Sequence, residues 1–565
     1  MHLALQIGQR GSCDDYNQSC GIRVSARRPK ATRVYNRGME ENMSSTQPSP
    51  QPGTQTRPTP ATNHRVQRSY MLRSATAAKD AFIAAPAQIN NGDEERYPDK
   101  SGTYTKGVLQ SGIGLVDPAA YRTFRRALDT GAPADFNAIV LGGPRTLNGP
   151  QGGLAFQLDC LDNSQFTSPP APAVASEQYA TELVELYWAS LLRDIPFTRY
   201  LSNSIAAQAA AELSGLGAYQ GPRDAAGNVT PALLFRGGFP GETVGPYLSQ
   251  FAVQNTSLGA LPIVQRYTTS KSNIDFMQDP VTFQQVQNGV STGLTLQPDT
   301  PVFLHNGRGL SAYTHVDVLY EAYFIAYLVL NTLNAPLNPG NPYNNSTTQN
   351  GFGTFGQPDI AGALAAVARE ALKAVWYQKW FVHLRHRPES GGALVYLANT
   401  GSSIDAKPSP TVLNSQAVNS SFTANQSYFL SQAFPEGSPT HPAYPTGHGM
   451  VAGACITVLK FFFDGNFVIP NPQEPSDDGT TLNGYTGAGA SQITVTGELN
   501  KLAHNISFGH GIHAGIHWRS DTDTSIQLGE AVALSFLRDH ANTYNEKFTV
   551  GLTKVDGMIA TITNL

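Results

Sequence analysis

The stretch HPAYPTGHGMVAGACITVLKFFF, residues 441–463, joins a loop of histidine, proline and glycine to an apolar segment. The loop has too little helix or strand periodicity to serve as scaffold alone. From Gly449 onward, apolar side chains recur at the spacing typical of a helix. Lys460 interrupts this apolar run, which is shorter than the ~20 residues of a membrane-spanning helix. The stretch therefore predicts a helix that begins beside a polar loop, and no membrane span.

Further segments with the same helical spacing indicate a mainly α protein. They cover residues 177–192, 205–216, 315–333, 360–382 and 520–541. Long connections rich in glycine, proline and asparagine, such as 337–359 and 470–492, separate several of them. The tail 547–565 alternates apolar and polar residues around Asp556-Gly557, a hairpin signal. We expect a large helical bundle with long loops and a small β-hairpin at the C-terminus.

Composition limits the partners and the domain boundaries. The chain has 565 residues, 14% of them charged, and a net charge of -4, which gives no basic footprint for nucleic acid. Residues 44–62 are a Pro/Ser/Thr/Gln mixture, so we expect residues 1–68 to be a disordered leader and linker and residues 69–565 to be one helical domain. The basic leader lacks the apolar region of a secretory signal and leaves the compartment open, between a transit-like segment and an artefactual extension.

Polar chemistry is concentrated in three separated stretches: KWFVHLRHRPE from 379, HPAYPTGHG from 441 and NISFGHGIHAGIHWRSD from 505. In the first, Lys379 and Arg387 are eight residues apart, so a helix that ends at Pro388 would carry both on one side. A guanidinium and an ammonium suit a tetrahedral oxyanion, because each oxygen accepts a charge-assisted hydrogen bond. The alternative is a solvated basic helix end.

The second stretch leads into the apolar helix. Thr446 is a candidate N-cap, and Gly447 allows a ligand to approach the backbone, so free N–H groups would face an anion. The same turn presents the His448 imidazole. The alternative is an ordinary capped loop with an exposed histidine.

In the third stretch, His510, His513 and His517 have spacings of three and four, which predicts one helical face. Asp521, four residues after His517, can accept the Nδ1 proton of that ring and leave Nε2 as a ligand or nucleophile. One alternative is a set of satisfied surface histidines. A zinc or iron site is another, but no HExxH or facial His/carboxylate pattern supports it.

Together, these motifs resemble a known family. The order Lys-x7-Arg-Pro, then His-Pro-x-Tyr-Pro-Thr-Gly-His, then Ala-Gly-Ile-His with an aspartate four residues on, resembles the vanadium-dependent haloperoxidases, particularly their algal and bacterial bromoperoxidase branch. LVELYWASLLRDIPF near 183, GPYLSQF near 245 and GRGLSAYTHVDVLYEAY near 307 are also similar to that family, and the resemblance spans roughly 70–544. The family shares its oxyanion pocket with phosphatidic-acid-phosphatase-like acid phosphatases.

The resemblance implies vanadate, with vanadium(V), as cofactor. His517 would supply the one protein bond to the metal, with Asp521 as its partner, and His448 would act as general acid–base. His441 occupies a position that implies bromide or iodide rather than chloride as the halide. The residues expected to bind the vanadate oxygens are Lys379, which would also polarise bound peroxide, Arg387, Thr446, the amide of Gly447, and His448 and His510 nearby.

One position departs from the family pattern. The family normally places an arginine six residues before the vanadium-binding histidine, where this chain has Gly511. Alignment from NISFGH instead puts His510 in the arginine place, with one extra residue to be absorbed in the loop before His517. Unlike an arginine, His510 changes charge near neutral pH, so vanadate binding should be weaker and should decrease as His510 loses its proton.

The implied activity is the oxidation of bromide, and iodide, by hydrogen peroxide to a hypohalous acid equivalent that halogenates organic acceptors, in a protein that forms homo-oligomers. An alternative is a phosphohydrolase in which His517 attacks phosphorus and His448 protonates the leaving group. Another is a binding protein that has lost activity with the missing arginine. His441 and the spacing of Lys379 and Arg387 favour the peroxidase.

Overall fold

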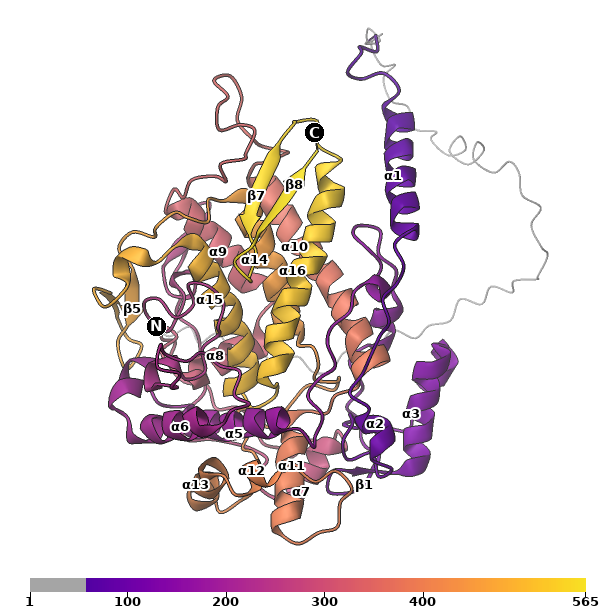
Figure 1. Cartoon of the computed structure of the whole chain (residues 1–565), viewed down its shortest axis with the longest axis vertical. Coiled ribbons are helices and arrows are strands. Elements are labelled where there is room, and N and C mark those ends of the chain that lie inside the picture. The colour runs from indigo at the N-terminus through magenta and orange to yellow at the C-terminus, as the bar shows by residue number, and fades with distance from the viewer. Residues whose placement is uncertain (1–56, 565) are drawn as a thin grey trace, which may run out of the picture. The chain divides into compact units, whose positions relative to one another are not determined.

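Figure 1 shows a computed structural model of the chain, which describes residues 57–564. Contacts divide the chain into two units, Met1–Gln67 and Arg68–Leu565. Most of the expected leader, 1–68, lies outside the described residues, so the predicted domain boundary stays a prediction. The second unit is rich in helices, and its strands form only small two-stranded sheets, which confirms the predicted mainly α class.

The core is built around two long helices, α14 (Gly447–Phe462) and α16 (Arg519–Ala541), which run beside each other in Figure 1. Every residue of α14 is buried, as its apolar sequence predicts. Their backbones touch at glycines: a Cβ on Gly453 would lie 1.9 Å from Ile526 O, and one on Gly529 would lie 2.1 Å from Met450 O. Only glycine permits this approach. The main neighbours of these two helices are α10 (Gln357–Tyr377) and α15 (Val495–Phe508).

Several other helices of the second unit form the lower layer in Figure 1. None of the helices within 57–564 is long and apolar enough to cross a bilayer. The larger ones are α1 (Arg65–Ala81), α3 (Pro118–Thr130), α5 (Glu177–Leu192), α6 (Ser204–Gly215), α8 (Gly307–Val316), α9 (Glu321–Thr332), α11 (Pro388–Asn399) and α13 (Gln416–Asn425). The shorter ones are α2 (Asp93–Arg96), α4 (Pro133–Asn137), α7 (Pro280–Gln287) and α12 (Pro410–Leu413).

The strands pair only with their sequence neighbours, and all pairs are antiparallel. The last pair confirms the predicted C-terminal hairpin: its register runs from Thr549↔Thr563 to Thr553↔Ile559, and Gly557 in the turn has a φ of +84°. The pairs are β1 (Gln110–Gly112) with β2 (Leu115–Val116), β3 (Thr256–Leu258) with β4 (Leu261–Ile263), β5 (Gln473–Pro475) with β6 (Leu482–Gly484), and β7 (Thr549–Thr553) with β8 (Ile559–Thr563).

The helix predicted over 315–333 is wrong in its first part. The chain leaves α8 at Asp317, whose φ and ψ of -66° and 153° are extended, and α9 begins only at Glu321. The Asp317 carboxylate there accepts a hydrogen bond from His448 Nε2 at 3.0 Å. Apolar spacing continues across this break, so the sequence pattern hides it.

The predicted helix that carries Lys379 and Arg387 and ends at Pro388 is also wrong. Lys379 lies in a π-helical turn, Gln378–His383, after which Leu384 is left-handed with a φ of 44°. Arg387 has an extended backbone, and Pro388 begins α11 instead of ending a helix, since proline at the first helical position loses no hydrogen bond.

A second π-helical turn, Gly509–His513, follows α15. It corrects the prediction that His510, His513 and His517 share one helical face, because His517 lies beyond it in the turn before α16. A π turn holds more residues than an α turn and so accommodates an inserted residue. The extra residue expected before His517 stays a prediction, and this turn is a place that could accommodate it.

Candidate functional site

The three polar stretches meet at the N-terminal ends of α11, α14 and α16. Arg387 links them, since its Nε donates to His441 O at 2.9 Å and its Nη1 lies 2.7 Å from His517 Nε2. Lys379 Nζ donates to the carbonyl oxygens of Pro442 and Ala443 at 2.9 and 2.7 Å. The side chains of this group, which we call the cradle, are Lys379, Arg387, His441, Thr446, His448, His510 and His517 together with the amide of Gly447.

The start of α14 leaves donors without partners. Thr446 is the N-cap residue, but its side chain makes no capping hydrogen bond. Its Oγ1 is buried, and within residues 57–564 it has no hydrogen-bond partner. The first N–H groups of a helix also lack intrahelical acceptors, and they attract anions. The hydroxyl of Thr446 and the amide of Gly447 are therefore available to an anionic ligand.

Positive charge is in excess among the cradle side chains. Burial and the neighbouring Arg387 hold the pKa of Lys379 well below its usual value. Burial also lowers the pKa of Arg387 to about 10. Asp521 is the carboxylate that offsets these shifts in both groups. A bound oxyanion would stabilise both cations, so this donor set fits vanadate.

The His517 ring is held in one tautomer. Arg387 Nη1 can only donate, so His517 Nε2, 2.7 Å away, is the acceptor and the ring proton is on Nδ1. That Nδ1 lies 2.9 Å from Asp521 Oδ2, as the sequence predicts. A histidine whose Nε2 lone pair is exposed to the cradle and whose other nitrogen donates to a carboxylate is a suitable metal ligand.

Asp521 is in turn fixed by Arg385, a residue that sequence reasoning missed. Arg385 Nη1 donates to Asp521 Oδ1 at 2.7 Å, and its Nη2 donates to Glu182 Oε2 at 3.1 Å. All three side chains are buried. Arg385 lies inside the motif KWFVHLRHRPE, so the doubled arginine around His386 was the available signal.

His448 is paired with Asp317, a second residue that the sequence did not reveal. Its Nε2 lies 3.0 Å from Asp317 Oδ1, a contact that orients the ring and suits proton transfer. On the other side of the His448 ring, the His510 ring stacks against it, with 3.8 Å between the ring centroids.

His510 therefore lies in the cradle. Its buried Nδ1 has no hydrogen-bond partner among the described residues. At Gly511, a Cβ would lie 3.1 Å from His517 Cβ, a close contact that would require a shift of a few tenths of an ångström. The assignment of His510 to the arginine position stays a prediction.

The structure places His441 in the cradle and His513 outside it. The His441 ring is tilted against Trp376, with 4.8 Å between the ring centroids, and Arg387 Nη2 lies 3.0 Å from His441 Nδ1, so His441 belongs to the cradle. Trp376 was missed because it falls inside a predicted helix. His513 points away, with its Nε2 3.0 Å from Tyr247 Oη, and burial lowers its pKa to about 3.

The chain is similar to proteins of known class. The family profile described as the VCPO second helical-bundle domain matches residues 360–546. A vanadium-dependent bromoperoxidase of Corallina officinalis is 31% identical, with 87% of this chain and 98% of the relative covered. Those of Corallina pilulifera and Ascophyllum nodosum are 32% and 31% identical, with 87% of this chain and 98% and 91% of the relatives covered.

A solved structure shows the same fold. The homohexameric second vanadate-dependent bromoperoxidase of Ascophyllum nodosum superposes with a TM-score of 0.85 at 28% identity, over 92% of this chain and 94% of that one. These relatives do not favour the phosphohydrolase alternative. The cradle, the fold and the sequence identity agree, and the chain belongs to the vanadium-dependent bromoperoxidase family.

Proposed function

We propose that this protein binds vanadate and uses hydrogen peroxide to oxidise bromide, and iodide, to a hypohalous acid that halogenates electron-rich organic acceptors. The overall reaction consumes peroxide, halide and one proton and releases hypohalous acid and water. Vanadate, when bound, supplies a Lewis acid that activates peroxide toward attack by the halide. The observation that carries the proposal is the buried Thr446 hydroxyl, which has no partner among the described residues and lies in the cationic cradle.

Lys379, Arg387, Thr446 and the Gly447 amide would hold the oxyanion by donating hydrogen bonds. Both cations are buried, so their interaction with a bound anion is stronger than it would be at the surface. The Lys379 ammonium already donates to two carbonyl groups and keeps a third N–H for the ligand. This residue would also polarise the activated peroxide.

His517 would bind vanadium through Nε2, the atom that the Asp521 contact leaves without a proton. In the structure, Arg387 Nη1 donates to His517 Nε2, and it would donate to the oxyanion instead when the ligand binds. His448, oriented by Asp317, would accept and return the protons that move as peroxide binds and water leaves. His441, beside Trp376, would lie next to the halide.

The test is bromination of a phenolic dye by purified protein given peroxide and bromide, before and after addition of orthovanadate. Phosphate serves as a competitor, and hydrolysis of a phosphate ester is measured alongside. Bromination that requires vanadate supports the proposal. Ester hydrolysis that vanadate inhibits, with no bromination, would instead assign the cradle to phosphoryl transfer.

We also propose that the protein assembles as a homo-oligomer. The support is the similar bromoperoxidase of Ascophyllum nodosum, whose structure is homohexameric. Sedimentation velocity of the full chain measures the assembly directly.

A further inference from the structure

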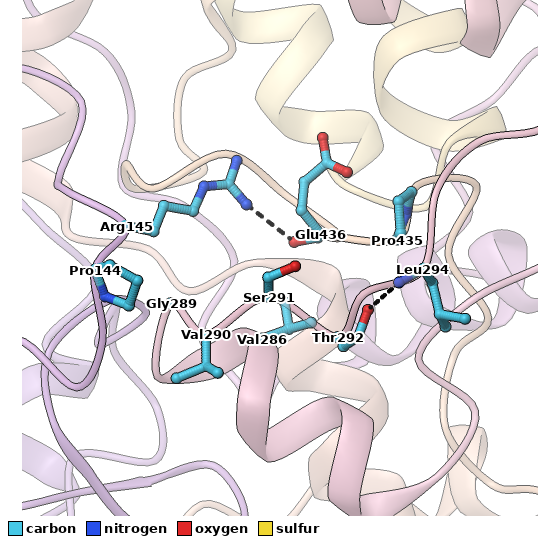
Figure 2. A pocket seen from close by; sticks show the side chains of 10 residues that line it. All are labelled: Pro144, Arg145, Val286, Gly289, Val290, Ser291, Thr292, Leu294, Pro435 and Glu436. Atoms are coloured by element: carbon cyan, nitrogen blue, oxygen red, sulfur yellow. Dashed lines mark hydrogen bonds between the residues drawn. The ribbon is translucent and has the colours of Figure 1, made fainter. Parts of the chain in front are cut away.

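A cavity of about 450 Å³ opens beside the loop that leads into the cradle. Figure 2 shows its lining residues, which come from the segments 144–145, 286–294 and 435–436. The lining contains none of the cradle residues. The cavity is thus a separate space with its own chemistry.

The floor of the cavity is formed by two loops in direct backbone contact. Arg145 N donates to Gly289 O at 3.2 Å. A Cβ on Gly143 would lie 2.6 Å from Asn288 O, so only glycine allows the loops to approach this closely. Asn288 Oδ1 also accepts from Gln110 N at 2.8 Å. These contacts keep the cavity formed without a ligand.

One side of the cavity is apolar and the other is cationic. Val286, Val290 and Leu294 supply the apolar side. The Arg145 guanidinium makes one long hydrogen bond, from Nη1 to Glu436 O at 3.5 Å, and has no ion-pair partner within residues 57–564. An arginine with unused N–H groups beside apolar side chains suits a flat organic anion.

Glu436 offsets part of this charge: burial raises the pKa of its carboxyl, but the hydrogen bond to His315 and the charge of Arg145 lower the pKa below its usual value. One carboxylate oxygen, Oε1, lies 2.7 Å from His315 Nε2. Figure 2 shows the carboxylate pointing away from Ser291 and Val290, while the backbone carbonyl faces Arg145. An anion that binds near Ser291 would therefore lie away from the Glu436 carboxylate.

The wall of the cavity is connected rigidly to the cradle. Pro435 and Glu436 belong to the loop that continues to His441. Two residues after Arg387, Glu389 accepts from Ser438 N and Ser438 Oγ at 2.7 and 2.8 Å. The cavity wall and the cradle therefore share one hydrogen-bonded loop.

We infer that this cavity binds the organic halogen acceptor, and that its preferred class is an electron-rich aromatic ring bearing a carboxylate, which Arg145 holds. The inference rests on the proposed function. In the transfer step, the aryl carbon forms a bond to bromine as the Br–O bond of hypobromous acid breaks, and the aryl proton leaves with the hydroxide as water.

Binding is tested without any turnover. Isothermal titration of the full chain uses 4-hydroxybenzoate as probe and the neutral 4-hydroxybenzyl alcohol as comparison, with no vanadate, peroxide or bromide present. We expect the carboxylate to bind about tenfold tighter, and Arg145→Ala to remove that difference. Ser291→Trp, which fills the cavity from an exposed loop, should weaken both probes, and Arg122→Ala on the outer side of α3 should change neither.

Selectivity is tested by competition. The enzyme is given both phenols at equal concentration, and the ratio of brominated products is compared with that from added hypobromous acid. We expect the wild type and Arg122→Ala to favour the carboxylate product and Arg145→Ala to return to the reagent ratio. Equal ratios for wild type and reagent, or equal binding of the two probes, would overturn the inference. If no bromide is oxidised at all, the proposed function fails, while the titration still decides whether the cavity binds.

Discussion

Two groups of buried histidines lie close together in sequence but in opposite electrostatic surroundings. His504, near the end of α15, lies between two carboxylates, with Nδ1 2.5 Å from Glu242 and Nε2 2.9 Å from Asp523. Burial alone would lower the pKa of His504, but the two carboxylates outweigh burial and raise the pKa to about 9. His510 and His517 follow later in the chain and face cations instead, and burial and these neighbours hold their pKa values well below the usual range.

The difference separates a structural histidine from a ligand-binding one. At His504 the chain supplies both the charge and its compensation, so no ligand is needed. In the cradle it supplies positive charge without enough negative charge, so a bound anion completes the site. Substitutions in the two groups should therefore change different properties, ligand affinity in one and protein stability in the other.

The largest effect is expected for His517→Ala. Removing the one expected metal ligand should weaken vanadate binding more than about 100-fold, because loss even of a supporting contact costs 10–100-fold. The dissociation constant is measured by titration of the purified protein, with His540→Ala at the far end of α16 as control. Unchanged vanadate affinity would remove His517 from the ligand role.

His504→Gln should reduce the free energy of unfolding by about 3 kcal/mol, the value of a pKa raised from about 6.5 to about 9. The pKa is higher in the folded state, so this stability is fully present below pH about 6.5 and is lost as pH rises through about 9. Urea unfolding at pH 6 and pH 10 should show a larger difference at pH 6. An equal loss at both values would mean that charge is not the cause.

Arg385 sharpens the comparison beside the cradle, because its contact with the site runs through Asp521, while its other bonds go to Glu182 and Ser520. Arg385→Ala should weaken vanadate binding about 10–100-fold by releasing the carboxylate that orients His517. Arg385→Lys keeps the charge and should recover part of the affinity. Measuring both the vanadate dissociation constant and the unfolding free energy of each variant separates positioning from general destabilisation. A loss of stability without a loss of vanadate affinity would contradict the prediction.

The smallest effect is expected for His510→Ala. If His510 takes the arginine position, removing one donor to the oxyanion should cost about 1 kcal/mol, or roughly fivefold in vanadate affinity. His513→Gln is the matched control, since His513 lies in the same π-helical turn as His510 but contacts Tyr247. Vanadate binding that His510→Ala leaves unchanged, in strength and in pH dependence, would show that another group replaces the arginine.

Much of the site follows from sequence because its parts lie in short motifs. Thr446, Gly447 and His448 are consecutive, and the apolar helix that follows fixes their position at an N-terminus. Asp521 is one helical turn from His517, a spacing that sequence shows directly. The C-terminal hairpin is visible for the same reason, since its turn is local.

The remainder depends on contacts between distant segments. Asp317 is 131 residues from its partner His448 and lies in an apolar pattern that reads as continuous helix. The left-handed Leu384 and the π turn before it redirect Arg387, and no local signal in the sequence marks either. The cradle contacts of Trp376 likewise form only when α10 reaches the loop that contains His441.

The glycine contact between α14 and α16 has a consequence for protein engineering. Gly453 is two turns from Thr446, about 10 Å along the helix, and a methyl group there would have to displace Ile526 O. The N-terminal ends of the two helices carry Thr446 and follow His517, so the packing of the helices supports both sides of the site. Mutant libraries restricted to residues that touch the ligand would omit these glycines, although they fix how closely the two helices pack.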